Sequence, residues 1–478
     1  MGGAPVLRVT AQDFYDYDKC PHRVYLDHHG NPEEKLPLAD FLNLLFERAL
    51  LHEQDVIKDL DHIVAEGKTL EERAAVTMDL MKDGVERIYH GVLLEDDDSG
   101  IPDLLEKVDG KSKLGDYFYK PVDIKSGSGY ESESKGTLRK DYGKQLFHYG
   151  KLLQQVQGYF PPGSEILNKR RERILYPLTD FAGLYAEAAP RVRALTSGEE
   201  TDEPALCSDC KNCQWWGHCE EILVKVNDLT LLPGAGRDKK ETLNGVGVCS
   251  IEDVAGFDFG KVKLRGIGPK TAESMPRAAR VALSGKMELL RKPDLPDSAM
   301  KIYFDFEDDP TQELVYLCGL WAEPSIKGLN FYGYFCTNET GEAKMWADFQ
   351  KLCTDIGSED YVVFHYSAYE KTKLNELERK YGIQERDAVE TFRNRMKDLL
   401  PVVKNSVVLP TRGYGLKELA PFIGRPYETE DAGGAQAIVW FQEYQKDPSR
   451  QDIFKKILGY NREDCLVLKA VYEWLRGL

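Results

Sequence analysis

The sequence predicts a multidomain α/β protein. A chain of 478 residues is too long for one hydrophobic core, because single cores stop growing at about 250 to 300 residues. Stretches in which apolar residues recur with the period of a helix alternate with stretches that have the period of a strand. Hydrophobic residues make up 42% and charged residues 30% of the chain, which is the balance of a soluble globular protein. We therefore expect roughly two to four compact domains.

Three regions with different patterns divide the chain. Residues 1–225 read as helix, then strand, then helix, which suits a mixed α/β domain. Residues 226–292 contain short helical pieces separated by glycine pairs and predict a small all-α segment. The stretch KPDLPDSAM then reads as a linker. Residues 298–478 begin with three strand-like runs and continue with helices, which predicts a second α/β domain.

Charge and hydropathy narrow the class of protein. A net charge of -17 argues against nonspecific coating of nucleic acid. Residues 226–292 differ, because their 12 basic and 8 acidic residues give +4 and leave -21 for the rest of the chain. We find no apolar run of about 18 residues and no charged-then-apolar leader, so we expect a cytoplasmic protein with no membrane span.

An acid, an apolar residue and a lysine follow one another at the end of a predicted strand, in YKPVDIK. Side chains two apart on a strand share a face, so Asp123 and Lys125 point the same way. Asp103 is the natural partner across a hairpin. Two such carboxylates, with the Ile124 carbonyl, can bind Mg²⁺ or Mn²⁺, and the lysine can position or help deprotonate the attacking water. The pattern predicts a site for phosphodiester hydrolysis.

Three other polar side chains can reach the same cleft. Gln145 and Tyr149 lie four apart on one helical face, and His52 on an upstream helix can supply a nitrogen ligand. Each also has a plainer reading. His52 can be a half-buried helix histidine, Gln145 and Tyr149 can simply pack, and Asp103 can be a turn residue after proline. The order of the set, more than any member, favours catalysis.

This ordered set resembles the RecB-like branch of the PD-(D/E)XK nucleases. That branch has a helix histidine followed by G-x-x-D, D-x-K and Q-x-x-x-Y. The matching positions are His52, Gly100 to Asp103, Asp123 to Lys125, Gln145 and Tyr149. The resemblance implies a restriction-endonuclease-like α/β core in residues 1–225, with nuclease chemistry.

Cysteines are grouped in CSDCKNCQWWGHCEE, and Cys20 lies far upstream. In a cytoplasmic chain they do not form a disulfide framework. Four thiolates can hold an iron-sulfur cluster of the 4Fe-4S type, a tetrahedral zinc ion is the alternative, and reduced cysteines without metal are the third reading. The spacing resembles the iron-sulfur subgroup of the same nucleases, which implies Cys20, Cys210, Cys213 and Cys219 as ligands and leaves Cys207 surplus. Such a cluster would join the first and last residues of the domain.

The glycine pairs of the middle segment have the pattern of helix-hairpin-helix loops. In LRGIGPKTA the glycines can expose backbone N–H groups at the start of a helix, where they grip a DNA phosphate. The candidate nucleic-acid-binding residues are Arg265, Gly266, Gly268 and Lys270. LPGAGRDKKETL reads as a degenerate first copy. Glycine turns that join helices without any ligand are the plainer reading.

The last domain carries acids at a second characteristic spacing. Asp305 and Glu307 share a face of a predicted strand, Tyr460 and Asp464 are one helical turn apart, and Glu370 follows a short strand between them. The order resembles the RNase H-like exonucleases of the DEDD group, whose four acids bind two metal ions and whose tyrosine orients the attacking water. The middle acid of that group is usually aspartate. Glu370 therefore leaves open whether this site is active or the domain is structural.

The whole plan resembles a bacterial and archaeal group of RecB-like nucleases, in which an iron-sulfur PD-(D/E)XK domain is fused to an RNase H-like domain, often through a helix-hairpin-helix segment. We predict a metal-dependent nuclease with two active sites that acts on DNA, on single strands or ends, with the second site working from a 3′ end. The sequence has no nucleotide-binding P-loop, so unwinding would need a partner such as a helicase or another repair or defence protein. RNA processing, a noncatalytic iron-sulfur adaptor that binds nucleic acid, and a zinc-stabilised interaction module remain alternatives.

Overall fold

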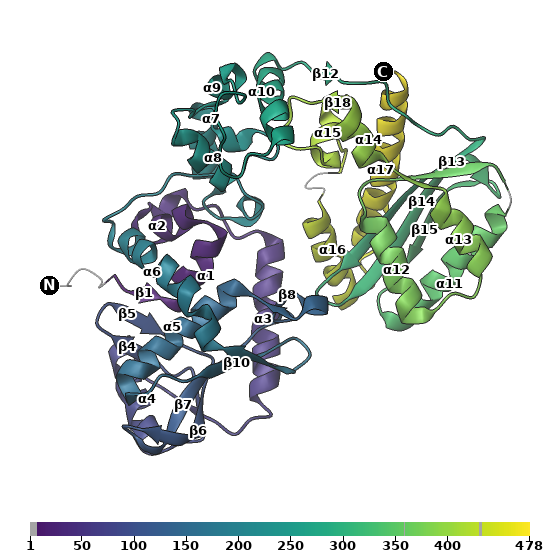
Figure 1. The fold of residues 1–478 in the computed structure, drawn as a ribbon. Coiled ribbons are helices and arrows are strands. Elements are labelled where there is room, and N and C mark those ends of the chain that lie inside the picture. Colours follow the sequence, from purple (N-terminus) through teal and green to yellow (C-terminus); the bar gives the residue numbers. More distant parts are fainter. Residues whose placement is uncertain (1–6, 358, 430–432) are drawn as a thin grey trace. The chain divides into compact units, whose positions relative to one another are not determined.

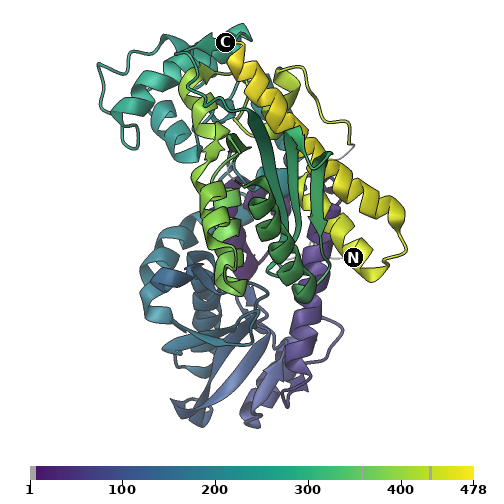
Figure 2. The same cartoon turned by 90° about the vertical axis from the view of Figure 1, so that its right-hand side faces the viewer.

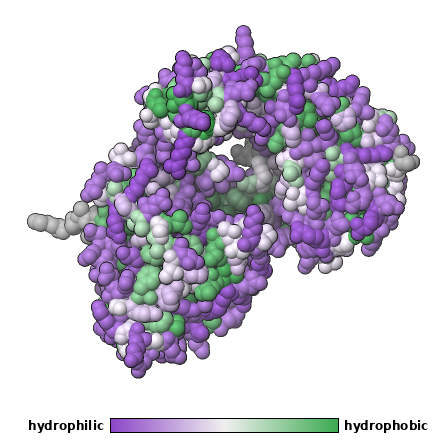
Figure 3. Space-filling view, viewed as in Figure 1, coloured by the Kyte–Doolittle hydropathy of each residue, from purple (hydrophilic) through white to green (hydrophobic). Residues whose placement is uncertain are grey.

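The computed structural model describes residues 7–357, 359–429 and 433–478. The chain divides into two compact units, Met1–Lys225 and Val226–Leu478, called here the first and second units (Figure 1). In the described ranges, no helix combines the length and the apolar character needed to cross a membrane. Figure 3 shows a face that is mostly hydrophilic, with smaller hydrophobic areas scattered over it.

A six-stranded mixed sheet forms the centre of the first unit. Two of its central strands, β6 and β7, form an antiparallel hairpin, and β7 pairs in parallel with β10. Leu104 lies opposite Val122, so the residue before β6 lies beside the end of β7. The order of strands is β11 (Arg173–Pro177), β10 (Gly163–Leu167), β7 (Gly115–Ile124), β6 (Leu104–Ser112), β3 (Arg87–Tyr89) and β2 (Ile63–Val64).

Smaller sheets and helices surround this sheet. One small sheet contains β1 (Val9–Thr10), β5 (Asp98–Gly100) and β4 (Leu93–Glu95), and another contains β8 (Tyr130–Ser132) and β9 (Thr137–Leu138). The helices are α1 (Ala11–Lys19), α2 (Pro21–His29), α3 (Asp40–Ile57), α4 (Leu70–Lys82), α5 (Lys140–Gln157), α6 (Ala182–Ser197) and α7 (Trp216–Lys225). Helix α5 packs closely, because a Cβ at Gly143 would lie 2.0 Å from the Phe181 ring.

The second unit begins with a small helical segment. Its helices are α8 (Arg237–Asn244), α9 (Ile251–Gly256) and α10 (Pro269–Ser284), and they share a core that includes Leu243, Val254 and Ala279. A short strand that follows, β12 (Glu288–Leu289), pairs with β18 (Val407–Val408). This pairing ties the helical segment to the α/β domain that follows it.

A five-stranded sheet forms the core of that α/β domain. The first three strands run antiparallel, and β13, β16 and β17 run parallel. The order is β15 (Leu329–Phe335), β14 (Leu314–Ile326), β13 (Met300–Asp309), β16 (Tyr361–His365) and β17 (Met396–Asp398). In chain order this is 3-2-1-4-5, with the first strand of the domain at the centre.

Helices cover both faces of this sheet. The helix α17 (Gln451–Arg476) runs along the strands, as Figure 2 shows, and packs on β13 and β14. The other helices are α11 (Glu339–Ile356), α12 (Tyr369–Tyr381), α13 (Arg386–Asn394), α14 (Leu399–Ser406), α15 (Leu416–Phe422) and α16 (Gly434–Lys446).

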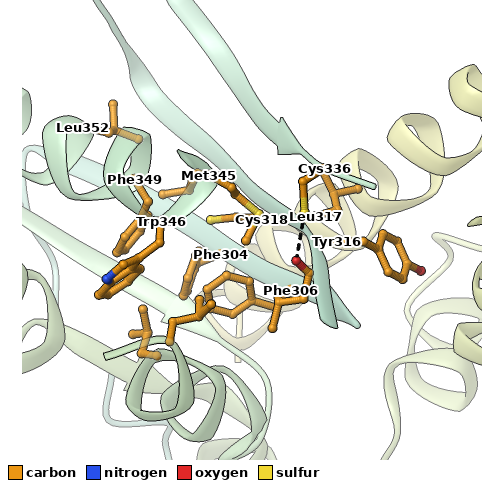
Figure 4. Close-up of a cluster of buried hydrophobic side chains, with 14 of the residues drawn as sticks. Phe304, Phe306, Tyr316, Leu317, Cys318, Cys336, Met345, Trp346, Phe349 and Leu352 are labelled. Atoms are coloured by element: carbon orange, nitrogen blue, oxygen red, sulfur yellow. Dashed lines mark hydrogen bonds between the residues drawn. The ribbon is translucent and has the colours of Figure 1, made fainter. Parts of the chain in front are cut away.

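Aromatic side chains fill the core between the sheet and α11. Phe304 stacks on Phe349, with ring centroids 5.7 Å apart, and Phe349 stacks on Trp346 (Figure 4). Phe306 packs on Phe304 in the same layer. Since strand side chains alternate, burying Phe304 and Phe306 here directs residues 303, 305 and 307 to the opposite face, on which α17 lies.

Candidate active sites and cysteine pocket

Three carboxylates, called here the acidic group, converge between β13 and α17. Asp305 and Glu307 come from the strand, and Asp464 comes from the helix. One oxygen of each carboxylate lies within 4.8 Å of the other two. Mg²⁺ and Mn²⁺ prefer oxygen ligands of this kind, so the donor set fits a divalent cation.

Without a cation, desolvation and repulsion between like charges make the ionised state of the acidic group unfavourable. Glu307 and Asp464 are buried, and Asp305 is half-buried. Burial, followed by repulsion from neighbouring carboxylates, raises the pKa of Asp305 and of Glu307 well above the ordinary value. Burial also raises the pKa of Asp464. A bound cation would offset both effects.

Neighbouring side chains fix two members of the acidic group. The amide Nδ2 of Asn461 donates to Asp305 Oδ2 at 2.8 Å. Gly319 provides the space for this amide, because a Cβ there would lie 1.6 Å from Asn461 Oδ1. The hydroxyl of Tyr427 donates to Asp464 Oδ1. Both carboxylates are therefore held before any ligand arrives.

Glu370 and Tyr460 lie near the acidic group without belonging to it. Glu370 is in the first turn of α12, and its Oε2 is 3.2 Å from His365 Nδ1. It is outside the described set whose ligand atoms lie within 4.8 Å of one another, although its charge contributes to the raised pKa of Asp305. Tyr460 is buried one helical turn before Asp464, and burial raises its pKa.

Lys417 on α15 points at the same site, and the sequence did not single it out. Its Nζ is 4.0 Å from Asp464 Oδ1 and lies 3.3 and 4.4 Å from the ring centroids of Tyr427 and Tyr460. Burial lowers the pKa of Lys417, and the nearby carboxylates oppose that shift. The mixture of small, basic and apolar residues in GYGLKELAP is the only local signal, and it does not reveal where the lysine points.

The first unit brings Asp103, Asp123 and Lys125 together at the open end of the β6–β7 hairpin. The backbone N–H of Asp103 lies 3.4 Å from Asp123 Oδ1, and the backbone N–H of Ile124 donates to Asp103 Oδ2 at 2.6 Å. Lys125 Nζ is 2.8 Å from Asp123 Oδ2. The acid, its partner across the hairpin and the lysine therefore share one small volume.

Electrostatics couple these three groups. Burial and the charge of Asp123 raise the pKa of Asp103 to about 7. Burial alone would lower the pKa of Lys125, but Asp123 and Asp103 outweigh it, and the pKa rises. Lys125 is therefore a stable cation beside Asp123.

Polar atoms without hydrogen bonds lie among the other expected residues. In the described part of the chain, His52 Nε2, Gln145 Oε1 and Asp123 Oδ2 are buried and make no hydrogen bond, although the last forms the ion pair with Lys125. An unmade hydrogen bond of a buried group costs about 1 to 3 kcal/mol. A cation, a water molecule or a substrate group could satisfy these atoms.

Tyr149 and two unexpected residues complete the surroundings. The Tyr149 hydroxyl donates to the Ile101 carbonyl at 3.4 Å, and burial raises its pKa. Glu53 and His90 each place one ligand atom within 4.8 Å of one from Asp103. His52 is not in that set. Sequence reasoning missed Glu53 and His90, because strand pairing brings His90 to Asp103 and no local motif marks it.

Five cysteines line one pocket, called here the cysteine pocket, together with Leu26, Trp215 and Trp216. The five are Cys20, Cys207, Cys210, Cys213 and Cys219. Cys207 Sγ lies 3.6 Å from Cys210 Sγ, so the surplus cysteine is inside the pocket and not apart from it. Clustered thiols with apolar walls fit an iron-sulfur cluster or a zinc ion.

Two glycine loops of the helical segment share one backbone design. In each, the first glycine has a positive φ and the second is the N-cap of the following helix. The pairs are Gly234 (φ 78°) with Gly236 before α8, and Gly266 (φ 73°) with Gly268 before α10. Arg265, Gly266, Gly268 and Lys270 are all exposed. A Cβ at either glycine of the second loop would meet nothing within 4 Å, so its backbone is open to a ligand.

Comparison with known proteins identifies one of these regions. A family model described as the RNase_H superfamily matches residues 302–476, a range that contains all three members of the acidic group. No curated protein matches the chain. The chain thus contains an RNase H-like domain at 302–476, a fold that generally uses Mg²⁺ or Mn²⁺ and indicates nuclease-type activity on nucleic acids.

Proposed function

We propose that this protein is a divalent-metal-dependent nuclease that hydrolyses phosphodiester bonds of DNA, on single strands or at free ends. The observation that carries the proposal is the convergence of Asp305, Glu307 and Asp464 within an RNase H-like domain. Neighbouring carboxylates of raised pKa, in a fold that generally uses Mg²⁺ or Mn²⁺, support a role as metal ligands.

In the second unit, the acidic group would hold the metal ions, with Glu370 as the additional acid. Bound divalent ions supply charge neutralisation on the phosphate and a nucleophilic water. Asn461 donates to Asp305 and would keep it oriented, and Tyr460, one turn before Asp464, would orient the water. Hydrolysis would proceed from a 3′ end.

In the first unit, Asp103, Asp123 and the Ile124 carbonyl would hold the catalytic ion, with His52 as a nitrogen ligand. Lys125, a cation beside Asp123, would position the water or the phosphate. Gln145 and Tyr149 would contact the substrate from α5. The hydrogen-bond vacancies of His52 and Gln145 within the described residues support this assignment.

Two further elements would support the nuclease. The cysteine pocket would hold a 4Fe-4S cluster, or zinc in its place, through Cys20, Cys210, Cys213 and Cys219. The exposed loop from Arg265 to Lys270 would bind DNA phosphates through its backbone N–H groups. We prefer these roles to purely structural ones, because the cysteine pocket and the glycine loop occur in the same chain as two acidic sites.

Digestion of 5′-labelled and 3′-labelled single-stranded DNA with Mn²⁺ tests the proposal. We expect Asp305→Asn to abolish shortening from the 3′ end and Asp123→Asn to abolish a different set of products. Asp348→Asn, which changes a half-buried acid of α11 that pairs with Lys344, is the matched control and should cleave as the wild type does. Matched RNA oligonucleotides distinguish RNA processing. The noncatalytic adaptor would be favoured if the protein binds DNA but does not cleave it, and if a variant with both Asp305→Asn and Asp123→Asn binds equally well.

A further inference from the structure

A set of three potential metal ligands includes Asp103 and a residue that follows the neighbouring strand β3. Glu53 comes from α3, His90 follows β3, and Asp103 precedes β6. Strands β3 and β6 are antiparallel, and the backbone N–H of His90 donates to the Asp103 carbonyl at 3.0 Å. His90 and Asp103 are therefore cross-strand neighbours. One ligand atom from each of the three residues lies within 4.8 Å of the others.

Surrounding contacts hold two of these ligands in place. Glu53 Oε1 accepts a hydrogen bond from the Tyr89 hydroxyl at 2.7 Å and lies 2.8 Å from His90 Nε2. The Tyr89 and His90 rings stack, with centroids 3.8 Å apart. Arg73 donates to the His90 carbonyl at 2.9 Å, which holds a backbone with a φ of 52°. Contacts of this outer kind orient the ligands of metal sites.

His52 does not take part in this set, although it precedes Glu53 in the sequence. Consecutive helical residues point about 100° apart. The hydrogen-bonding environment of His52 includes the backbone of Asn168, which follows β10, and burial lowers its pKa. Glu53 instead faces the β3 side. Glu53 therefore contacts His90 and Asp103, whereas His52 faces the segment that follows β10.

The negative charge around Asp103 also favours binding of a cation. Glu53 and Asp123 each lie beside Asp103, and Lys125 is the ammonium that pairs with Asp123. Asp123 is 1% exposed, and within the described ranges its Oδ2 makes no hydrogen bond. A carboxylate shared by two ions about 3.5 to 4 Å apart is the usual arrangement of two-metal sites.

We infer that Glu53, His90 and Asp103 form a second divalent-cation site in the first unit, and that Asp103 is shared between this ion and the ion held with Asp123. The inference rests on the proposed nuclease function of this unit. An imidazole ligand beside carboxylates selects Mn²⁺ over Mg²⁺, because Mg²⁺ prefers oxygen ligands alone. The second ion would stabilise charge on the side of the phosphate opposite Lys125.

Counting bound Mn²⁺ tests the inference. The full chain with Asp305→Asn and Glu307→Gln, which disables the acidic group, is titrated with Mn²⁺, and free Mn²⁺ is measured by electron paramagnetic resonance. We expect two ions per chain. His90→Asn and Glu53→Gln should each leave one ion, or weaken the second by at least about tenfold. Asparagine tolerates a positive φ, so His90→Asn keeps the backbone.

A histidine outside the set provides the control. His62 contacts the Tyr89 ring and its own segment, so His62→Asn should keep both ions. Unchanged stoichiometry and affinity in both His90→Asn and Glu53→Gln would overturn the inference.

The same background separates this inference from the proposed function. Cleavage that depends on Asp123, with a single ion that is indifferent to His90, leaves the nuclease and removes the second site. Two ions that depend on His90, with no cleavage that depends on Asp123, leave the cation site and remove the nuclease role of this unit.

Discussion

Asn461 donates a hydrogen bond to Asp305 at 2.8 Å, and it can do so because the residue opposite Asp305 on β14 is glycine. A side chain at Gly319 would collide with the amide of Asn461, since a Cβ there would lie 1.6 Å from Oδ1. One strand of the sheet therefore supplies the acid, its neighbour supplies the space, and α17 supplies the amide that orients the acid.

Replacing Gly319 should disturb the orientation of Asp305 through Asn461, without direct contact with the acid. We expect Gly319→Ala to lower the free energy of unfolding by about 1 to 3 kcal/mol through overpacking. We expect cleavage from the 3′ end to fall about a hundredfold as Asp305 loses its orientation. Chemical denaturation and labelled DNA measure the two effects. Gly459→Ala on α17, where a Cβ would meet nothing within 4 Å, should be neutral or stabilising, and equal losses in both variants would contradict the account.

Lys417 should compete with metal ions for the acidic group. Like charges about 4 Å apart repel by up to about 4 kcal/mol near a protein surface, so we expect Lys417→Met to tighten Mn²⁺ binding at this site by at least about tenfold. Calorimetric titration of the chain with Asp103→Asn, which removes the carboxylate shared by both proposed ions of the first unit, measures the change. Lys456→Met, which replaces a lysine that lies over the Trp440 ring, should leave the Mn²⁺ affinity unchanged.

The acidic group should make the metal-free protein less stable as pH rises. Its carboxyl groups have raised pKa values, so the folded protein binds protons that the unfolded chain has already released. The stabilisation from these protons is full below the ordinary values of 3.8 and 4.5 and is lost as pH rises through the raised values. We expect the midpoint of thermal unfolding in EDTA to fall between about pH 5 and pH 8.

Mn²⁺ should reverse this trend. We expect the added ion to raise the unfolding midpoint more at about pH 8 than at about pH 5, because protons compete with the metal at the lower pH. Asp305→Asn should flatten the pH dependence in EDTA and reduce the response to Mn²⁺. An identical pH profile in this variant and the wild type would show that other groups cause the trend.

The cysteine pocket predicts a coloured protein after anaerobic purification. We expect Cys20→Ala to lose the iron of the proposed cluster and to unfold at a lower temperature, because the cluster would join distant parts of the first unit. Iron analysis and visible absorbance measure the loss. Cys207→Ala should retain the cluster, and Cys249→Ala, an exposed cysteine outside the pocket, should behave as the wild type does. A colourless wild-type protein that contains stoichiometric zinc would show that the pocket binds zinc and not an iron-sulfur cluster.

The second glycine loop should contribute to DNA affinity through charge. We expect Lys270→Ala to weaken binding uniformly across sequences and to reduce the slope of log affinity against log salt by about 1. Fluorescence anisotropy at several salt concentrations gives the slope. Lys261→Ala, in the same segment but paired with Asp258, is the control. Equal slopes in the wild type, Lys270→Ala and Lys261→Ala would contradict phosphate binding by this loop.

Local periodicity predicted the elements that carry the acids. The alternation in KIYFDFE placed Asp305 and Glu307 on one face of a strand, and the structure has that strand as Met300–Asp309. The helical repeat placed Tyr460 and Asp464 one turn apart, and both lie on α17. These relations need only neighbouring residues, so the sequence contains them.

Residues brought in by long-range pairing were not predictable. His90 reaches Asp103 through the pairing of β3 with β6, and its own positive φ is unusual for a residue other than glycine. Lys417 reaches Asp464 across two separate helices. Glu370 follows a short strand, as predicted, but the pairing of its carboxylate with His365 depends on the turn after β16.

The cysteine pocket sets the order in which the first unit can be completed during synthesis. Cys20 leaves the ribosome early, whereas Cys207 to Cys219 emerge only after every strand of the six-stranded sheet has been made. Closure of the pocket is therefore a late event for the nascent chain. A chain that stops before these residues would contain Cys20 with none of its four companions.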